Sequence, residues 1–229
     1  MLLFNTDLLL SDPASFVILV AAIGISLVMA ISVHEWAHAY AANRLGDMTA
    51  TRLGRLTLNP KAHLDPAGSI MILVAGFGWG RPVPVNPARL LHGRAGMAMV
   101  SFAGPLSNVV MAFLFAALFQ LGLLTATGFT GQDLRGLDPV AWVTVIAMYG
   151  VILNLILAAF NLLPIPPLDG GGILSGIVPR NMLPAVAKLQ VIGPVVLMGL
   201  ILSSFVTDLR ILSTMFAPVM SLADALIYR

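Results

Sequence analysis

Long runs of apolar residues without any charge alternate with short polar segments along the chain. Stretches without Asp, Glu, Lys, Arg or His extend over residues 13–33, 95–132, 139–168 and 189–207. A helix needs about 20 mostly apolar residues to cross the hydrocarbon core of a bilayer. The apolar residues are not confined to one face, as they would be in an amphipathic helix of a soluble protein. The pattern therefore predicts four transmembrane helices, at residues 16–45, 98–124, 139–162 and 188–206.

Two further apolar stretches are less regular. Residues 66–80 are short and rich in glycine, and the prolines at positions 82, 84 and 87 forbid a continuing helix. We expect a membrane-embedded hairpin or re-entrant loop around 66–86, where protein or a water-filled cavity satisfies the irregular backbone. Residues 211–227 contain Pro218 and Asp224 and fit a fifth span or an interfacial helix, of which we favour the span. The expected fold is an all-α polytopic membrane protein with four to five transmembrane helices.

Composition supports lipid as the main solvent of this chain. Of its 229 residues, 59% are hydrophobic and 10% are charged, whereas a soluble domain carries about 25% charged residues. The mean hydropathy is +0.96. Twelve basic and ten acidic side chains give a net charge of +2, which is too small an excess to indicate a nucleic-acid partner. Cysteine is absent, and the ten acids include a single glutamate, Glu35.

The basic residues predict the orientation in the membrane. Seven of the twelve lie between the first and second predicted helices, within residues 44–94. The positive-inside rule therefore places the N-terminus outside and the loops 46–95 and 163–187 in the cytoplasm. The acidic N-terminal stretch continues directly into an apolar run, so we expect a retained helix and not a cleaved signal peptide. We expect one membrane domain over residues 1–229, in a bacterial or archaeal plasma membrane.

The strongest chemical signal is His34-Glu35-Trp36-Ala37-His38, near the end of the first predicted helix, which Gly46 is expected to cap. Residues i and i+4 of a helix share one face, so both imidazoles can reach the same metal ion. Glu35 sits beside the first histidine and can approach a metal-bound water from the side. Zinc lowers the pKa of such a water to about 7, and a carboxylate removes its proton during attack on a carbonyl.

The setting of this motif favours function, because ionisable residues inside membrane helices are costly and usually functional. The alternative is a cluster of interfacial polar residues, with Trp36 and Tyr40 as belt aromatics. His34 lies 18 residues after Phe16, the expected outer boundary. At about 1.5 Å per residue this distance is roughly 27 Å, close to the inner face of a hydrocarbon core about 30 Å thick. We therefore expect the metal in the cytoplasmic half of the membrane.

A catalytic zinc needs a third protein ligand and an open position. Asp169 is the best candidate, because it follows three prolines that interrupt the third predicted helix. The first and third helices run in the same direction, so Asp169 should emerge on the same side as His34 and His38. The two other histidines, His63 and His92, fall in the predicted cytoplasmic loop. The alternative is an exposed aspartate at an ordinary helix end, since prolines commonly follow helices.

These motifs resemble those of the site-2 protease family of intramembrane zinc metalloproteases. The resemblance rests on HEWAH in the first helix and on NLLPIPPLDGG after the third. HLDPAGS (63–69), GWGRPVPVNP (78–87) and FAGPLSN (102–108) reinforce it by content and order. Together the motifs cover most of residues 30–175, and helices at 188–227 complete the expected domain. The chain looks like a minimal form of the family, without an appended regulatory domain.

The resemblance implies a role for each matching residue. His34, His38 and Asp169 would bind one Zn²⁺ per chain, with Glu35 as the general base. Asn161, eight residues before the aspartate, would contact the substrate backbone or the developing oxyanion.

Asn108 is a second such amide, with an interhelical hydrogen bond as an equally good alternative. Residues 68–86 would present an edge to an unwound substrate by strand addition. The family commonly has a basic residue after LDGG, where this chain has Gly172.

The expected function is zinc-dependent hydrolysis of peptide bonds in or near transmembrane segments of membrane proteins. Substrates would be membrane-anchored precursors or remnant signal peptides, reached within the lipid bilayer. The principal alternative is a non-catalytic zinc-binding membrane protein, either a transporter or a scaffold. A transporter would distribute its ligands along a path through several helices, whereas these candidates converge at one depth.

Overall fold

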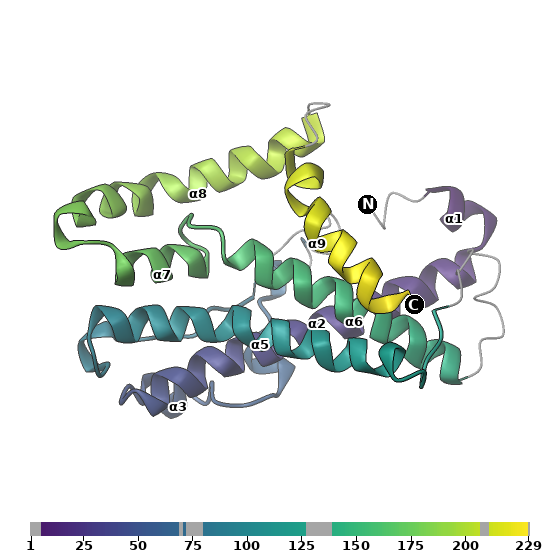
Figure 1. The fold of residues 1–229 in the computed structure, drawn as a ribbon, viewed down its shortest axis with the longest axis horizontal. Helices are drawn as coiled ribbons and strands as arrows, with labels where there is room; N and C mark the ends of the chain where they lie inside the picture. Colours follow the sequence, from purple (N-terminus) through teal and green to yellow (C-terminus); the bar gives the residue numbers. More distant parts are fainter. Residues whose placement is uncertain (1–5, 69–70, 72–79, 127–138, 207–210, 229) are drawn as a thin grey trace.

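The computed structural model describes residues 6–68, 71, 80–126, 139–206 and 211–228. Within these residues the chain is helical and forms no β-strand (Figure 1). An isolated antiparallel bridge joins Leu64 to Gly80. The predicted all-α class is confirmed.

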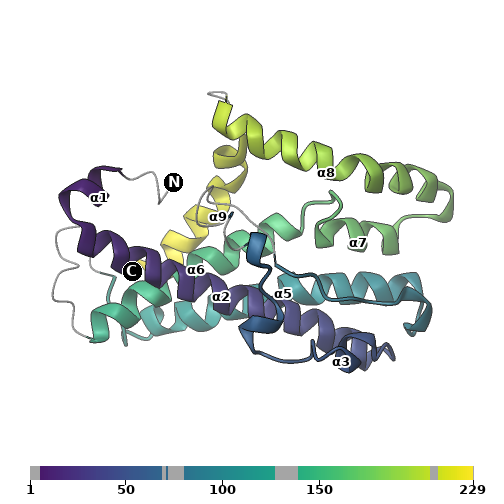
Figure 2. The same cartoon turned by 180° about the vertical axis from the view of Figure 1, so that it is seen from behind.

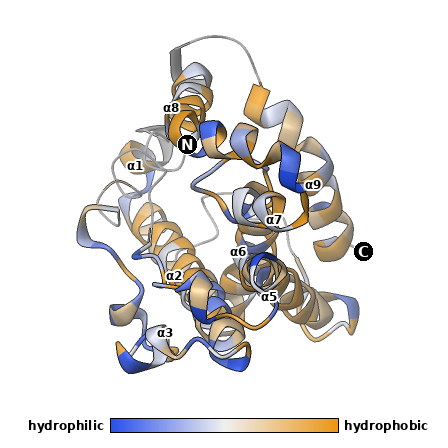
Figure 3. Cartoon of the chain, turned by 90° about the vertical axis from the view of Figure 1, so that its left-hand side faces the viewer, coloured by the Kyte–Doolittle hydropathy of each residue, from blue (hydrophilic) through white to orange (hydrophobic). Residues whose placement is uncertain are grey.

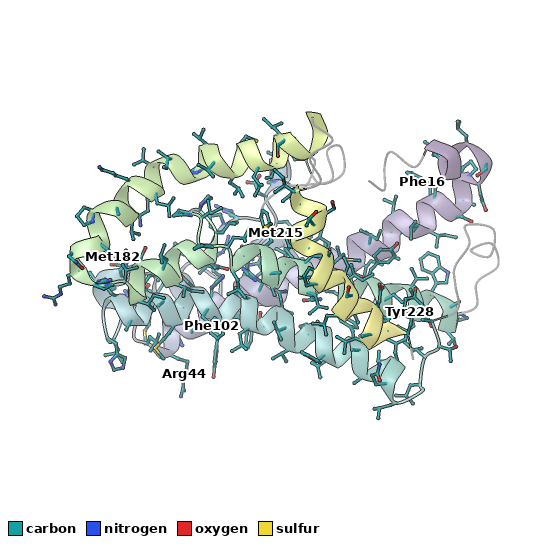
Figure 4. All side chains as sticks on the ribbon, turned by 45° about the horizontal axis from the view of Figure 1, so that its top comes forward. Phe16, Arg44, Phe102, Met182, Met215 and Tyr228 are labelled. Atoms are coloured by element: carbon teal, nitrogen blue, oxygen red, sulfur yellow. The ribbon has the colours of Figure 1, made fainter. Side chains whose placement is uncertain are left out.

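Within the described part of the chain, four helices are long and apolar enough to cross a membrane. They are α2 (Pro13–Arg44), α5 (Arg94–Gln120), α6 (Pro139–Asn161) and α8 (Leu183–Val206). Each coincides within a few residues with one predicted span, so the chain is a multi-pass membrane protein. Arg44 and Met182 mark one end of the molecule, and Phe16 and Tyr228 lie towards the other (Figure 4).

Glycine caps decide where two of these helices end. The sequence pattern extended the second span four residues beyond Gln120, the last residue of α5. Gly122 adopts a positive φ of 71°, and the next N–H, from Leu123, donates to the carbonyl of Leu118 at 2.9 Å. This is the Schellman arrangement, which stops the helix although the following residues are still apolar. Gly46, with φ 98°, ends α2 in the same way and confirms the predicted cap.

Helices α2, α5 and α6 pack against one another and form the core of the bundle (Figure 1). Small residues allow this close approach. The largest buried cluster joins α5, α6 and the shorter helix α9 (Ile211–Ile227) through Ala112, Ala116, Phe119, Ala147, Val151, Leu155, Ala223 and Ile227. Hydrophobic residues run along the helices, whereas hydrophilic residues gather in connecting segments such as that around α3 (Thr49–Arg52; Figure 3).

A short helix, α7 (Asp169–Ile177), follows α6 and packs on α5. Gly176 allows the close contact, because a Cβ there would lie 2.8 Å from the carbonyl oxygen of Arg94. The Arg94 side chain donates to the carbonyls of Ser175, at 2.7 Å, and Val178, also at 2.7 Å. A cation at a helix C-terminus satisfies its free carbonyls and its dipole. Arg94 thereby fixes α7 from the end opposite Asp169.

Helix α8 lies apart from this core (Figure 4). Only 11% of the residues in its most apolar 18-residue stretch are buried. Its contact with the rest includes Gly193, whose Cα lies against the backbone of Pro166. Val191 and Val195 are 77% and 74% exposed. Large apolar side chains exposed on a helix of this length are expected where lipid is the solvent.

The segment between α2 and α5 folds back along these two helices (Figure 2). It contains α3 and the 3-10 turns η2 (Pro60–Ala62) and η3 (Pro87–Arg89). Residues 69–70 and 72–79, ten of the 21 positions of the hairpin or re-entrant loop expected around 66–86, lie outside the described residues. The bridge between Leu64 and Gly80 brings the two flanks of that segment together.

Candidate metal centre

The spacing of His34 and His38 along α2 places their side chains together. Their four-residue spacing puts both side chains on one face, and their Nε2 atoms lie 3.0 Å apart. Both residues are buried, with 7% and 8% of their surface exposed. The face they share is turned towards α5 and away from bulk solvent.

Asp169 reaches these histidines because the chain turns sharply after α6. The turn needs glycine at position 170, where a Cβ would lie 2.5 Å from the carbonyl oxygen of Leu162. Asp169 then opens α7 with its carboxylate facing α2. Its Oδ2 lies 3.1 Å from Nε2 of His34, and its Oδ1 lies 3.2 Å from Nε2 of His38. The structure therefore brings together the three ligands expected from the sequence.

The donor set fits zinc. Two imidazole nitrogens and one carboxylate are common ligands of catalytic zinc, at about 2.0–2.2 Å from the ion. Ligand atoms at the corners of such a tetrahedron are about 3.3 Å apart, close to the separations observed here. Oδ2 of Asp169 is buried and makes no hydrogen bond within the described residues. Burial alone would raise the pKa of Asp169, but the two adjacent imidazoles lower it, so the carboxylate is ionised.

The outer nitrogen of each histidine has its own acceptor on α5. Nδ1 of His38 lies 2.8 Å from the backbone carbonyl of Val100, and Nδ1 of His34 lies 2.6 Å from Oδ1 of Asn108. Such partners orient a ligating imidazole and leave Nε2 free for the metal. Gly104 lies between these two residues of α5, and a Cβ there would come within 2.6 Å of Cε1 of His34. Glycine is thus required for α5 to lie this close to the metal ligands.

A cavity of about 460 Å³ adjoins the three ligands. Glu35 and Asn161 line it, together with Ser101 of α5 and residues 80–85 of the returning segment, except Arg81 and Pro84. Glu35 therefore faces the same space as the three candidate ligands. Asn161 also donates to the carbonyl of Leu157 at 3.0 Å, within its own helix.

Asn108 occupies a different position from Asn161. It is fully buried and forms interhelical hydrogen bonds, which is the structural alternative that the sequence left open. It contacts the candidate ligand His34 directly, whereas the cavity lining does not include it.

The wall formed by residues 80–85 is held by Arg55. This buried side chain donates to the carbonyls of Arg81 and, at 3.2 Å, Pro82. Burial lowers the pKa of Arg55, the negative charge of Glu35 raises it in part, and Arg81 lowers it further. The guanidinium nevertheless remains charged, as arginine does in proteins. Arg55 thus positions the extended segment opposite the metal ligands.

The sequence interpretation did not identify several residues of the site. Asn154 of α6 is fully buried and hydrogen-bonded to Asn108, and a polar residue in an apolar helix is a signal that could have identified it. Arg55 could be located only after the return of the 80–85 segment was known. The Val100 carbonyl carries no sequence signal, because every residue has one.

Comparisons with known proteins agree with this geometry. The sequence model of peptidase family M50 matches residues 22–203. The chain is 43% identical over 189 residues to a Bacillus subtilis protein named "Putative zinc metalloprotease YwhC", an alignment that covers 81% of this chain and 80% of that protein. It is 33% identical over 171 residues to "Putative zinc metalloprotease Rip2" of Mycolicibacterium smegmatis, covering 71% of this chain and 60% of that protein. No solved structure matches the chain.

Proposed function

The chain belongs to peptidase family M50, the site-2 protease family of zinc metalloproteases, and on this premise we propose that it cleaves peptide bonds inside the membrane. The substrates would be transmembrane segments of other membrane proteins or remnant signal peptides. His34, His38 and Asp169 would hold one zinc ion per chain, and Glu35 would act as the general base.

One observation carries the proposal: the candidate ligands lie within the bundle of membrane-crossing helices. His34 and His38 belong to α2, and the α5 residues that contact them, Val100 and Asn108, lie inside a helix that begins at Arg94. A metal site at this depth is costly unless the reaction takes place there. The site therefore supports a substrate that is itself in the membrane.

The residues of the cavity suggest how a substrate is bound. A transmembrane helix keeps its amides in its own hydrogen-bond ladder, so a few residues must unwind before attack. The extended segment 80–85, which Arg55 holds beside the cavity, offers backbone groups to the unwound strand. Asn161, on the same cavity, is positioned to donate a hydrogen bond from its amide to the substrate.

The chemistry then divides between the metal and the chain. Zinc in this site would polarise the scissile carbonyl and acidify water. Glu35 accepts the proton of the attacking water on its carboxylate and passes it to the leaving amine. His34 and His38 present Nε2 to the metal, and their Nδ1 atoms face Asn108 and the Val100 carbonyl. The cavity beside these residues has room for the water that hydrolysis consumes.

We place the protein in the plasma membrane with the active site towards the cytoplasm. The basic residues support this orientation, because seven of twelve lie within residues 44–94 and mark one side of the bundle. Arg44, at the end of α2 nearer to the site, belongs to this side (Figure 4). Water and protons would then reach Glu35 from the cytoplasm.

Glu35→Gln is the most direct test. The amide cannot accept a proton at neutral pH, so cleavage of a transmembrane substrate in detergent or proteoliposomes should fall by at least about 100-fold. Zinc content and thermal unfolding should match those of the wild type, because Glu35 is not among the ligands. Cleavage at the wild-type rate by this variant would rule out the assignment.

The same variant can identify the substrate. Comparative membrane proteomics of cells with wild-type or Glu35→Gln protein should show single-pass fragments that accumulate only with the variant. Mapping the cleavage site of each fragment would decide whether the bond lies within the membrane. Cleavage sites confined to soluble domains would contradict the proposal.

A further inference from the structure

Two buried asparagines connect the three core helices to one of the metal ligands. Asn154 belongs to α6, Asn108 to α5 and His34 to α2, and both amides are fully buried. The Asn108 side chain lies 2.8 Å from that of Asn154 and 2.6 Å from the His34 ring. We call Asn108 and Asn154 the asparagine relay.

Backbone carbonyls determine the direction of every hydrogen bond in the relay. Nδ2 of Asn154 faces the carbonyl of Gly150 at 2.8 Å, and Nδ2 of Asn108 faces that of Ala30 at 3.1 Å. A carbonyl can only accept, so the amide group that faces it must be the NH₂. Both amides therefore have one possible orientation in this network.

That orientation determines which nitrogen of His34 carries hydrogen. The Asn108 NH₂ donates its hydrogens to Ala30 and to Oδ1 of Asn154, which leaves Oδ1 of Asn108 facing the imidazole. An amide oxygen only accepts, so Nδ1 of His34 must be the donor. A neutral imidazole with hydrogen on Nδ1 has its lone pair on Nε2, the atom that faces Asp169.

From this geometry we propose that Asn108, oriented by Asn154, is a positioning residue that fixes the tautomer and ring orientation of His34 for metal binding. The inference rests on the zinc site of the proposed function and adds a role for two residues outside the cavity lining. Asn108 acts through its acceptor oxygen, and Asn154 acts by preventing rotation of the Asn108 amide.

A set of three variants tests this role. Asn108→Leu removes the acceptor for His34, and Asn108→Asp keeps an acceptor while it loses the donors to Ala30 and Asn154. Ser26→Ala is the matched control, because Ser26 also joins α2 to α6, through a 2.9 Å hydrogen bond to the carbonyl of Ile146. That bond does not involve a metal ligand. Zinc affinity is measured in detergent by competition with a chelator, and thermal unfolding is measured on the metal-free proteins.

The relay predicts an order of zinc affinities that differs from the order of stabilities. Asn108→Leu should bind zinc about 10- to 100-fold more weakly than the wild type, the range for lost outer-shell partners. Asn108→Asp should bind zinc more tightly than Asn108→Leu, although it is no more stable without metal. Ser26→Ala should lose stability and keep its zinc affinity. The visible spectrum of bound Co²⁺ should change in Asn108→Leu and remain that of the wild type in Ser26→Ala.

Other outcomes would overturn the inference. A purely structural role predicts that Asn108→Asp, which buries a charged oxygen against the Ala30 carbonyl and Oδ1 of Asn154, binds zinc as weakly as Asn108→Leu. Should Asn108→Leu fail to fold, Asn154→Leu replaces it, and its zinc affinity should fall below that of Ser26→Ala. Equal zinc affinities of Asn154→Leu and Ser26→Ala would contradict the proposed role of the asparagine relay. A wild-type protein that binds no zinc would instead contradict the metal site, and with it the proposed function.

Discussion

At the scale of single residues, Gly104 sets how near α5 can approach the metal ligands. A Cβ at this position would lie 2.6 Å from Cε1 of His34, closer than real atoms pack. The nearest atoms belong to the rings of His34 and His38, and those rings are held by Asn108 and the Val100 carbonyl of the same helix. Neither ring can give way without leaving its acceptor.

Gly104→Ala should therefore weaken zinc binding and lower the free energy of unfolding by about 1–3 kcal/mol, the usual cost of overpacking. Chelator competition and thermal unfolding in detergent measure the two effects. Gly24→Ala in α2 is the control, because a Cβ there has no atom of the described residues within 4 Å. Its greater helix propensity should leave stability unchanged or raise it by up to about 1 kcal/mol. Equal zinc affinities of the two variants would show that Gly104 does not constrain the site.

The convergence of the three candidate ligands could be predicted from the sequence. His34 and His38 are four residues apart on one helix, and Asp169 follows a proline-broken helix of the same direction, so their meeting follows from periodicity and topology. The contact between Asn108 and His34 depends instead on the register of α5 against α2. Periodicity gives the face of a helix but not its register, so the sequence left two roles open for Asn108.

At the scale of elements, the segment between α2 and α5 is fastened by one aspartate. Asp47 follows α2 and is fully buried. Its Oδ2 accepts from the N–H of Asn86 at 2.6 Å, and its Oδ1 accepts from the N–H of Thr49 at 3.0 Å. Burial by itself would raise the pKa of Asp47, but the hydrogen bond from the Thr49 hydroxyl, the two backbone hydrogen bonds and the charge of Arg89 lower it below the ordinary value of 3.8.

A carboxylate whose pKa is lower in the folded state stabilises the fold only while it is ionised. The contribution of Asp47 should be complete above pH 3.8 and should disappear as the pH falls through the lowered folded value. Asp47→Asn should cost about 1–3 kcal/mol at neutral pH, because the amide leaves buried donors poorly satisfied. The free energy of unfolding, measured in detergent between about pH 2 and 6, should fall less steeply with decreasing pH in this variant than in the wild type. Asp224→Asn, which removes an exposed charge from α9, is the control. An equally weak pH dependence of the free energy of unfolding in that control would contradict the role of Asp47.

The long elements could be predicted from hydrophobic runs, since lipid imposes length and composition together. The short ones could not. Helix α7 has nine residues, four of them glycine, and its sequence has no strong helical signal of its own. It forms because Arg94 caps its carbonyls and because Gly172 and Gly176 pack closely on α5. These are tertiary contacts, which override local propensity.

At the scale of the whole molecule, the metal site joins segments that are far apart in the chain. Between His38 and Asp169 lie 130 positions, which include the whole of α5 and α6. Helices α5 and α6 pack directly on α2 and on each other. Helix α7 instead reaches α2 through the side chain of Asp169. A ligand that binds only the folded arrangement adds its binding free energy to the stability of that arrangement.

Removal of zinc should therefore lower the thermal stability of the entire bundle. At a free zinc concentration 100 times the dissociation constant, binding adds about 2.7 kcal/mol to the free energy of unfolding. Chelation should lower the unfolding temperature by the corresponding amount, and added zinc should restore it. Asp169→Ala, which lacks one of the three ligands, should respond far less to either treatment. If metal analysis shows that zinc has been removed and the unfolding temperature of the wild type does not change, α2 and α7 are held together by packing alone. The site would then serve the reaction without contributing to the fold.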